Sequence, residues 1–336
     1  MLRWGQKAAW TALLMVAVLG VTACGANNTP KEAAATNNTE KTQPSAETAS
    51  KAENTTEDNA TRTVTDEFGE VEIPVHPKRV VGLYVEDYLK ALGVTPVVQW
   101  YHPTWGKQDY LHLDVPLFDF SGNLEALLDQ DPDLIIVDGG VDKEKYDQYS
   151  KIAPTYRLKE ATLQDSTEIL KAVADVLGIP EKAETVLAEY KQKVEDGKTK
   201  LQQAVGKETV AVIRLNVADK TLALFGVKNR FTGVIYKDFG LTPIPMAANM
   251  TDYQAIISEE VIPELGADHL IVFPANGTWE DPENQEAYKT LEGPLWKNIP
   301  AIKNGKVYKM ERSHWQTGAI TANSMKLDDL LKYMVK

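Results

Sequence analysis

Aromatic side chains gather in the segments that directly follow apolar, β-branched stretches of the chain. The carboxyl ends of parallel strands meet at one edge of a sheet, so side chains that follow the strands can surround a ligand there. Flat rings with a few polar donors suit an organic molecule with apolar arms, which predicts a binding cleft. The predicted aromatic lining is Tyr84, Trp100, Tyr101, His102, Trp105, Trp279, His314 and Trp315. Any single one of these rings could instead fill the core.

Two arginines are candidates for the polar side of this cleft. Arg214 stands at the end of a strand-like stretch at 209–216, and Arg230 stands next to Phe231 before a helical segment. A guanidinium donates two parallel hydrogen bonds to carboxylate or hydroxamate oxygens, which fits a ligand-binding role. A surface ion pair is the alternative for Arg230.

Composition excludes several other kinds of function. A net charge of −12 makes nucleic acid an unfavourable partner, and one cysteine in 336 residues excludes disulfide frameworks and thiolate zinc clusters. A secreted α/β enzyme is a rival hypothesis, but no Gly-x-Ser-x-Gly, Gly-x-Gly-x-x-Gly or phosphate-binding loop is present. No catalytic or metal-ligating residues are therefore predicted, since only His102 and His314 lie in suitable segments for a metal.

The N-terminus is predicted to be a signal peptide at 1–23, with Arg3 and Lys7 before an apolar stretch at 8–19. Small residues before Cys24 resemble the lipobox of bacterial lipoproteins, in which that thiol carries the lipid. The alternatives are an uncleaved anchor or an ordinary signal with an incidental cysteine. Residues 25–61 contain no Val, Ile, Leu, Met or aromatic residue, so 24–61 is interpreted as a lipidated, disordered tether.

Strand-like stretches at 79–84, 96–101, 133–138, 209–216 and 269–273 alternate with helical segments, which indicates an α/β fold. Residues 123–138 align without a gap on 258–273, pairing Glu125 with Glu260 and placing an Asp before each strand. Two lobes of similar construction explain this match, and chance similarity between helix–strand units is the alternative.

Between these halves, apolar positions recur at helical spacing from 181 to 205. An unbroken helix there would be about 38 Å long and could cross between lobes, although Gly197 could kink it. An ordinary surface helix is the alternative. The predicted organisation is an N-terminal lobe at 62–178, an interlobe helix at 179–206 and a C-terminal lobe at 207–336.

An ordered set of short motifs completes the sequence evidence: DEFG at 66–69, IP at 73–74, PKRVV at 77–81, ALGV at 91–94, NLE at 123–125, PDLII at 132–136 and IAPT at 152–155. Together with the lipobox and tether, this set resembles the iron-siderophore-binding lipoproteins of bacterial ABC importers, a family that also includes the cobalamin binders. The resemblance implies two Rossmann-like lobes joined by one long α-helix, with the ligand in the cleft between them.

The resemblance also implies a function. The protein would be a non-enzymatic, monomeric receptor that is lipid-anchored on the extracytoplasmic face of the cell membrane. It would deliver a ferric siderophore to the ABC permease subunits and, through them, to their ATPase. The siderophore itself holds the iron, so the resemblance implies no cofactor and no protein metal ligand.

Two finer expectations follow. In this family a glutamate on each lobe docks with permease arginines, which implies Glu125 and Glu260, although a carboxylate in the first turn of a helix is also favoured by the helix dipole. A ferric tris-catecholate is strongly anionic and would require a cluster of Lys and Arg, so two placed arginines favour a near-neutral hydroxamate. Cobalamin, haem, ferric citrate and a catecholate are alternatives, and a free divalent metal is the least favoured.

Overall fold

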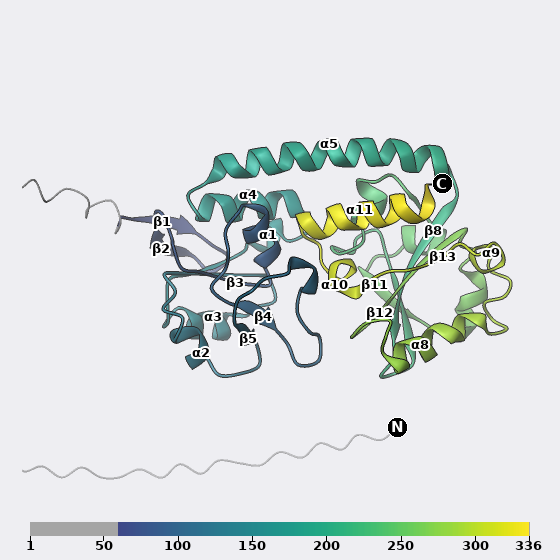
Figure 1. The fold of residues 1–336 in the computed structure, drawn as a ribbon, viewed down its shortest axis with the longest axis horizontal. Helices are drawn as coiled ribbons and strands as arrows, with labels where there is room; N and C mark the ends of the chain where they lie inside the picture. The colour runs from purple at the N-terminus through teal and green to yellow at the C-terminus, as the bar shows by residue number, and fades with distance from the viewer. Residues whose placement is uncertain (1–59, 336) are drawn as a thin grey trace, which may run out of the picture. The chain divides into compact units, whose positions relative to one another are not determined.

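Two β-sheets organise residues 60–335, the part of the chain that the computed structural model describes (Figure 1). The predicted signal peptide, Cys24 and nearly all of the predicted tether lie outside these residues. Within the described residues, no helix combines the length and apolar character needed to cross a membrane.

The first sheet has five parallel strands in the order β5-β4-β3-β6-β7, typical of an α/β lobe. Its central strands are buried along their whole length, which explains their continuous apolar sequences. A separate antiparallel hairpin of β1 (Thr61–Thr65) and β2 (Glu70–Pro74) precedes it. The strands are β3 (Val80–Leu83), β4 (Gln99–Tyr101), β5 (Leu117–Asp119), β6 (Leu134–Val137) and β7 (Thr155–Arg157).

The helices around this sheet are short except for the last. That helix, α4, begins where the Asp165 carboxylate accepts the backbone N–H of Thr167 at 2.9 Å, the usual way to satisfy the first turn. The helices are α1 (Glu86–Ala91), η1 (Asp109–Leu111), α2 (Glu125–Leu128), α3 (Lys143–Tyr149), η2 (Glu160–Thr162) and α4 (Ser166–Val176).

The second sheet is mixed, in the order β11-β9-β8-β12-β13, with β10 beside the start of β8. Strands β9 and β11 run antiparallel to their neighbours, and the other pairs are parallel. The strands are β8 (Thr209–Asn216), β9 (Thr221–Phe225), β10 (Thr242–Pro243), β11 (Gln254–Ile257), β12 (His269–Pro274) and β13 (Val307–Lys309). The helices are α6 (Val234–Lys237), α7 (Pro245–Ala248), η3 (Glu259–Glu264), α8 (Pro282–Lys289), η4 (Thr290–Glu292), α9 (Pro300–Lys303) and α10 (Arg312–Trp315).

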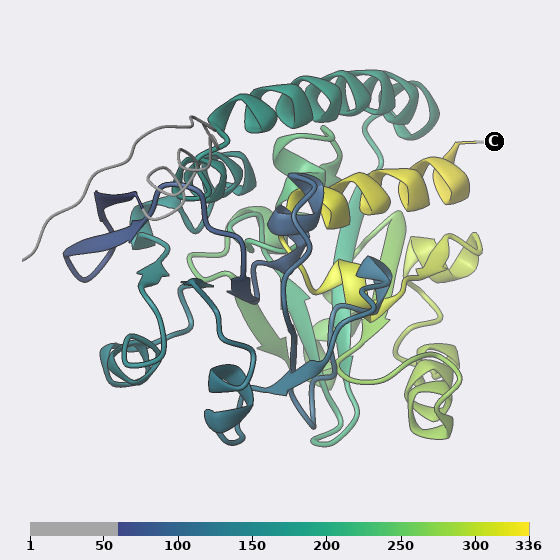
Figure 2. The same ribbon diagram turned by 60° about the vertical axis from the view of Figure 1, so that its left-hand side comes forward.

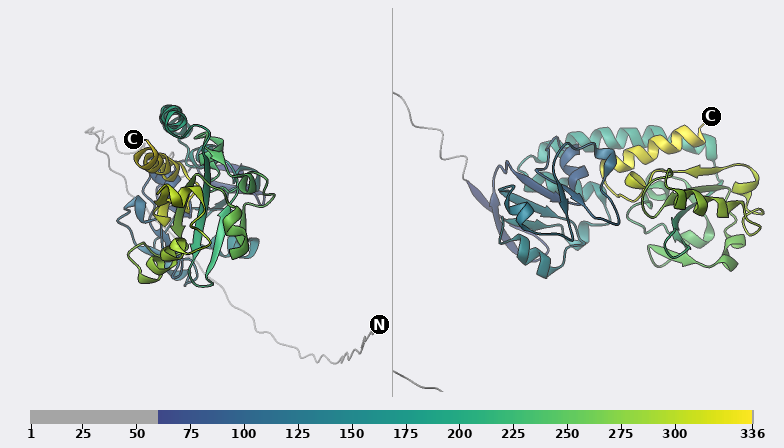
Figure 3. Two further views of the ribbon diagram at one scale, coloured as in Figure 1. Left: turned by 90° about the vertical axis from the view of Figure 1, so that its right-hand side faces the viewer. Right: turned by 60° about the horizontal axis from the view of Figure 1, so that its bottom comes forward.

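Helix α5 (Pro180–Val205) connects the two halves, as Figure 1 and the right-hand view of Figure 3 show. The predicted helix is confirmed, and it is unbroken over 26 residues, about 39 Å. Its first half packs into the core under the first sheet through Leu187, and its second half packs into the other core through Leu201. Gly197 does not kink the helix; a Cβ there would lie 2.7 Å from the Leu327 methyl groups, so glycine permits close packing.

Helix α11 (Ile320–Met334) lies beside α5, and Figure 2 shows both on the same side of the sheets. Ala319 and Ile320 belong to the hydrophobic core of the first half, whereas Leu327 and Leu330 belong to that of the second. The chain therefore passes between the two halves three times: through α5, back through the segment that leads into α11, and again along α11 itself.

The two aligned segments have similar structures but different helices. Residues before β6 form the short α-helix α2, whereas the matching residues before β12 form the 3₁₀-helix η3, which contains Pro263. The two aligned aspartates make equivalent hydrogen bonds. Asp133 accepts the backbone N–H of Arg79 at 2.9 Å, just before β3, and Asp268 accepts that of Thr209 at 2.8 Å, at the start of β8. Each carboxylate thus ties the beginnings of two central strands together.

Candidate ligand-binding site

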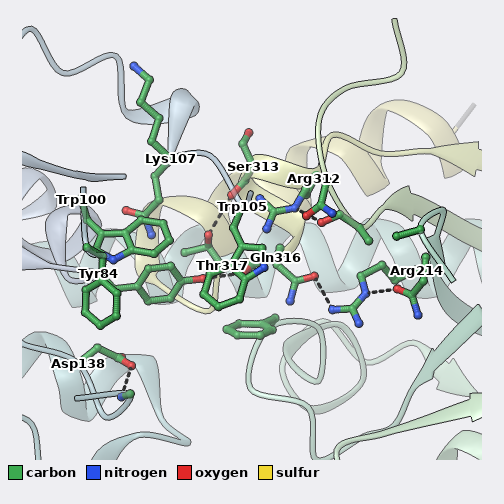
Figure 4. A pocket seen from close by; sticks show the side chains of 18 of the residues that line it. Tyr84, Trp100, Trp105, Lys107, Asp138, Arg214, Arg312, Ser313, Gln316 and Thr317 are labelled. Atoms are coloured by element: carbon green, nitrogen blue, oxygen red, sulfur yellow. Dashed lines mark hydrogen bonds between the residues drawn. The ribbon is translucent and has the colours of Figure 1, made fainter. Parts of the chain in front are cut away.

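A cavity of about 780 Å³ lies between the carboxyl ends of the two sheets (Figure 4). Both halves of the protein contribute to its wall, and four of the predicted site residues lie there: Tyr84, Trp100, Trp105 and Arg214. The sequence did not single out most of the others, which include Lys107, Gln108, Phe120, Asp138, Asn216, Asp219, Phe231, Arg312, Ser313, Gln316 and Thr317.

Aromatic rings form the wall on the side of the first sheet. Tyr84 follows β3 in a left-handed backbone conformation, φ 65°, which is uncommon for a residue with a side chain and marks a locally strained position. Its ring meets Trp100 edge-on at 5.1 Å, and its hydroxyl donates to the backbone oxygen of Gln316 at 3.1 Å. Burial raises the pKa of Tyr84, so the hydroxyl remains a donor.

Trp105 stands at the tip of a tight loop after β4. His102 and Gly106 exchange backbone hydrogen bonds of 3.0 and 2.8 Å, and Gly106 has the positive φ of 72° that such a turn requires. The indole is 51% exposed and stacks on the His102 ring at 4.0 Å. His102 therefore supports the Trp105 ring without lining the cavity itself, and the half-buried Tyr101 does not line it either.

Two guanidinium groups face the cavity from the second half. Arg214 donates from Nε to Asn216 Oδ1 at 2.9 Å and from Nη1 to Gln316 Oε1 at 3.3 Å, as Figure 4 shows. Arg312 donates from Nε to the backbone oxygen of Ala275. Burial lowers the pKa of both arginines, and the charge of Arg214 lowers that of Arg312 further. Two partly desolvated cations at one wall favour a ligand with anionic or strongly polar oxygens.

Arg230 occupies a different position from the one predicted. Its Nη2 lies 2.9 Å from the Asp138 carboxylate, which follows β6 in the other half of the protein, and it does not line the main cavity. The guanidinium joins the two halves through an ion pair, and its contact with a ligand stays a prediction. The sequence could not reveal this pair because the two residues lie 92 positions apart.

Trp279, His314 and Trp315 also lie away from the cavity, so their predicted place in its lining is wrong. Trp315 is fully buried and donates from Nε1 to Asp329 Oδ2 at 2.8 Å, and His314 Nε2 lies 2.6 Å from the same oxygen. Trp279 donates from Nε1 to the backbone oxygen of Met310 at 2.9 Å and packs within the second half.

For His314 and Trp315 the physical reason is that the residues after β13 form the helix α10 rather than an open loop. Helical spacing turns Arg312, Ser313 and Gln316 toward the cavity and the two residues between them toward the core. Inspecting the residues that follow each strand therefore identified the correct segment of the sequence, but the wrong face of the helix that it forms. Arg312, a cation two residues before the predicted histidine, was the available signal.

Comparisons with known proteins agree with this arrangement. Residues 85–313 match the family described as periplasmic binding proteins. The chain belongs to this family. Over 325 residues it is 35% identical to the iron(3+)-hydroxamate-binding protein FhuD of Bacillus subtilis (strain 168), covering 90% of this chain and 89% of that one. From the same organism, the probable siderophore-binding lipoprotein YfiY is 30% identical, covering 82% and 88%, and the Fe(3+)-citrate-binding protein YfmC is 31% identical, covering 82% and 87%.

A solved structure agrees as well. It is described as a FhuD fold-family periplasmic binding protein component of a Fep/Fec-like ferrichrome ABC transporter from Bacillus subtilis. It superposes with a TM-score of 0.68 at 31% identity and covers 81% of this chain and 100% of its own. The predicted resemblance to siderophore-binding proteins of ABC importers is confirmed, as are the α/β fold with two sheets and the non-catalytic role.

Proposed function

We propose that this protein captures a ferric siderophore of the hydroxamate type and delivers it to an ABC permease for iron uptake. One observation carries the proposal: a single cavity of about 780 Å³ has aromatic rings on one wall and two arginines on the other. Rings bind the flat organic arms of a chelate, and guanidinium groups bind the oxygens around its iron. The relatives FhuD and YfiY, named for iron–hydroxamate and siderophore binding, support the same assignment.

The charge of the lining favours a hydroxamate over a catecholate. Lys107, Arg214 and Arg312 are its cations, while Asp219 opposes them and Asp138 is neutralised by Arg230. A ferric tris-catecholate carries a large negative charge that the surplus of these cations over Asp219 balances only in part, whereas a ferric trihydroxamate is close to neutral. Ferric citrate is the second candidate, because the Arg214 and Arg312 pair also suits carboxylates and YfmC is a relative.

A tryptophan-fluorescence titration tests the ligand class. Ferric hydroxamates, ferric catecholates, ferric citrate, haem and cobalamin are titrated separately into the wild-type protein. A ferric hydroxamate should quench with the lowest dissociation constant, through Trp100 and Trp105, which both border the cavity. Trp105→Phe should therefore reduce the quenching, while the matched Trp279→Phe should keep it, because that indole lies outside the cavity. Tighter binding of citrate or a catecholate would overturn the hydroxamate assignment.

Arg214→Ala tests the polar wall. Loss of hydrogen bonds between a charged group and ligand oxygens should weaken binding by about 1.5–3 kcal/mol, roughly ten- to a hundredfold. The melting temperature should change little, since within residues 60–335 the Arg214 side chain hydrogen-bonds to no groups other than the side-chain amides of Asn216 and Gln316. Normal binding together with a much lower melting temperature would show that Arg214 is a structural residue.

Permease docking through Glu125 and Glu260 is part of the proposal. Both side chains are exposed, and each lies just before a central strand, β6 or β12. The double variant Glu125→Ala/Glu260→Ala should bind the siderophore normally but abolish iron uptake by cells. The matched control is Glu184→Ala/Glu189→Ala on the exposed face of α5, which should take up iron normally. Normal uptake by the first variant would place the docking surface elsewhere.

Attachment to the membrane through Cys24 is also proposed. The relative YfiY is named a lipoprotein, and the residues before Cys24 resemble a lipobox. Cys24→Ser should move the protein from the membrane fraction to the soluble fraction without changing its affinity for the ligand. A variant that stays with the membrane would contradict lipid attachment at this residue.

A further inference from the structure

The hairpin between β8 and β9 carries a chain of hydrogen bonds that ends on Arg214. Asn216 and Thr221 face each other across the two strands at the closing end of the hairpin. Arg214 Nε donates to Asn216 Oδ1 at 2.9 Å, and Asn216 Nδ2 donates to Thr221 Oγ1 at 3.0 Å. The Thr221 hydroxyl in turn donates to Asp219 Oδ1 at 2.7 Å. These hydrogen bonds therefore connect the Arg214 guanidinium in the ligand cavity to the Asp219 carboxylate in the hairpin turn.

Each link of this chain permits only one orientation. The guanidinium can only donate, so the Asn216 amide must present its oxygen to Arg214 and its nitrogen to Thr221. The Thr221 hydroxyl accepts that hydrogen and gives its own to Asp219. Hydrogen bonds from the Thr221 hydroxyl and backbone lower the pKa of Asp219, which keeps the carboxylate ionised as the final acceptor.

This series of hydrogen bonds also determines which N–H groups of the Arg214 guanidinium remain free to bind a ligand. Asn216 takes the Nε hydrogen and Gln316 takes one Nη1 hydrogen, so three of the five N–H groups remain. The Phe225 ring lies 5.4 Å from the guanidinium carbon and supports one face of the group. Thr221 does not line the cavity, so its influence on a ligand passes through the two lining residues that it bonds, Asn216 and Asp219, of which Asn216 is the one that bonds Arg214.

We propose that Thr221 is a positioning residue for ligand binding: its hydroxyl fixes the Asn216 amide and so aims the free N–H groups of Arg214 at the oxygens of the bound iron chelate. The inference rests on the proposed function. Without the hydroxyl, the Asn216 amide loses the acceptor that holds its nitrogen, so its oxygen no longer has a fixed place and Arg214 can leave the orientation that the ligand requires.

Two variants of one residue test the hydroxyl itself. Thr221→Val has nearly the same shape and keeps a β-branched side chain in β9, but it removes the hydroxyl. Its dissociation constant for the best chelate of the fluorescence panel should rise roughly 3- to 30-fold, with a melting temperature close to that of the wild type. Thr221→Ser restores the hydroxyl and should bind within about twofold of the wild type. Equal binding by the Val and Ser variants would overturn the proposal.

A double-mutant cycle with Arg214→Ala tests the route of the effect. If Thr221 acts through Arg214, Thr221→Val should cause no further loss of affinity in the Arg214→Ala background. A loss of the same size in both backgrounds would show that Thr221 acts on the cavity independently and would refute the positioning role.

A measurement without ligand separates this inference from the proposed function. If the wild-type protein binds no chelate of the panel, the proposed function fails, but the hydrogen-bond chain can still be observed. In ¹H–¹⁵N NMR spectra the Arg214 Nε–H should exchange slowly with water in the wild type and in Thr221→Ser, and markedly faster in Thr221→Val. The same exchange rate in all three proteins would overturn the proposal.

Discussion

Replacing Glu86 with glutamine should remove a large part of the pH dependence of folding stability. Glu86 begins α1 and is only 1% exposed. Its Oε1 accepts the backbone N–H of Trp100 at 2.6 Å, while its Oε2 has no hydrogen-bond partner among the described residues. Burial raises the pKa of Glu86 from 4.5 to about 8, against the opposing effect of the backbone N–H groups around it. The folded protein therefore keeps this carboxyl protonated at neutral pH.

The size and sign of the effect follow from that pKa. Below pH 4.5 both the folded and unfolded states hold the proton, so burial of Glu86 has no pH-dependent cost. Between pH 4.5 and about 8 only the folded state holds it, and the free energy of unfolding falls by about 1.4 kcal/mol per pH unit. The total loss is about 5 kcal/mol, and it is constant above pH 8. Glutamine keeps the acceptor for Trp100 and has no proton to lose.

Urea unfolding of the wild type and Glu86→Gln at pH 5.5, 6.5 and 7.5 measures this directly. The stability of the variant relative to the wild type should increase by about 3 kcal/mol over these two units, and comparing the two proteins cancels the other titrating groups. The neighbouring Asp87→Asn is the control. Burial raises the pKa of Asp87 as well, but both of its oxygens accept hydrogen bonds, so an amide there should break contacts and destabilise the fold, unlike Glu86→Gln. A difference between wild type and Glu86→Gln that does not change with pH would refute the reasoning.

Two further predictions concern the helices that cross between the sheets. Gly197→Val should destabilise the protein by about 1–3 kcal/mol in urea unfolding, because its Cβ would overlap Leu327, whereas Gly140→Ala should have little effect because nothing lies within 4 Å. Burial lowers the pKa of Lys326 to about 7, so wild-type stability should rise by about 1.4 kcal/mol per unit between pH 7 and 10. Lys326→Met should lack that rise, and an identical pH profile for both proteins would contradict the assignment.

Much of the fold could be predicted because its signals are local. The stretch at 209–216 forms strand β8 with the predicted bounds. Most of its eight residues are buried, so the local sequence is enough to predict a strand without knowing its neighbours in space. Helix α5 followed from its apolar spacing in the same way. The stretch at 96–101 contains only three strand residues, at Gln99–Tyr101, because a proline cannot donate to a sheet and the chain joins β3 only after it.

The site was predicted in part, and the misplaced residues have two different physical reasons. Tyr84 and Arg214 were identified because a residue at the end of a strand must lie at the edge of the sheet. Trp315 was misplaced because its direction depends on the one-turn helix α10, and a single turn leaves almost no periodic signal. Arg230 was misplaced because its partner Asp138 lies in the other lobe, and the sequence carries no sign of such a contact.

The contacts of Asp87 and its neighbours connect the ligand cavity to the segment that joins the two lobes. Its carboxylate accepts the backbone N–H groups of Thr321 and Ala322 at 2.9 and 3.0 Å, in the first turn of α11, where a negative charge also meets the positive end of the helix. Three residues before Asp87, the Tyr84 hydroxyl donates to the backbone oxygen of Gln316. The Gln316 side chain accepts from Arg214 in the cavity wall. A ligand that binds Arg214 therefore acts on the segment that joins the lobes, so substitutions in that joint should alter affinity without touching the ligand.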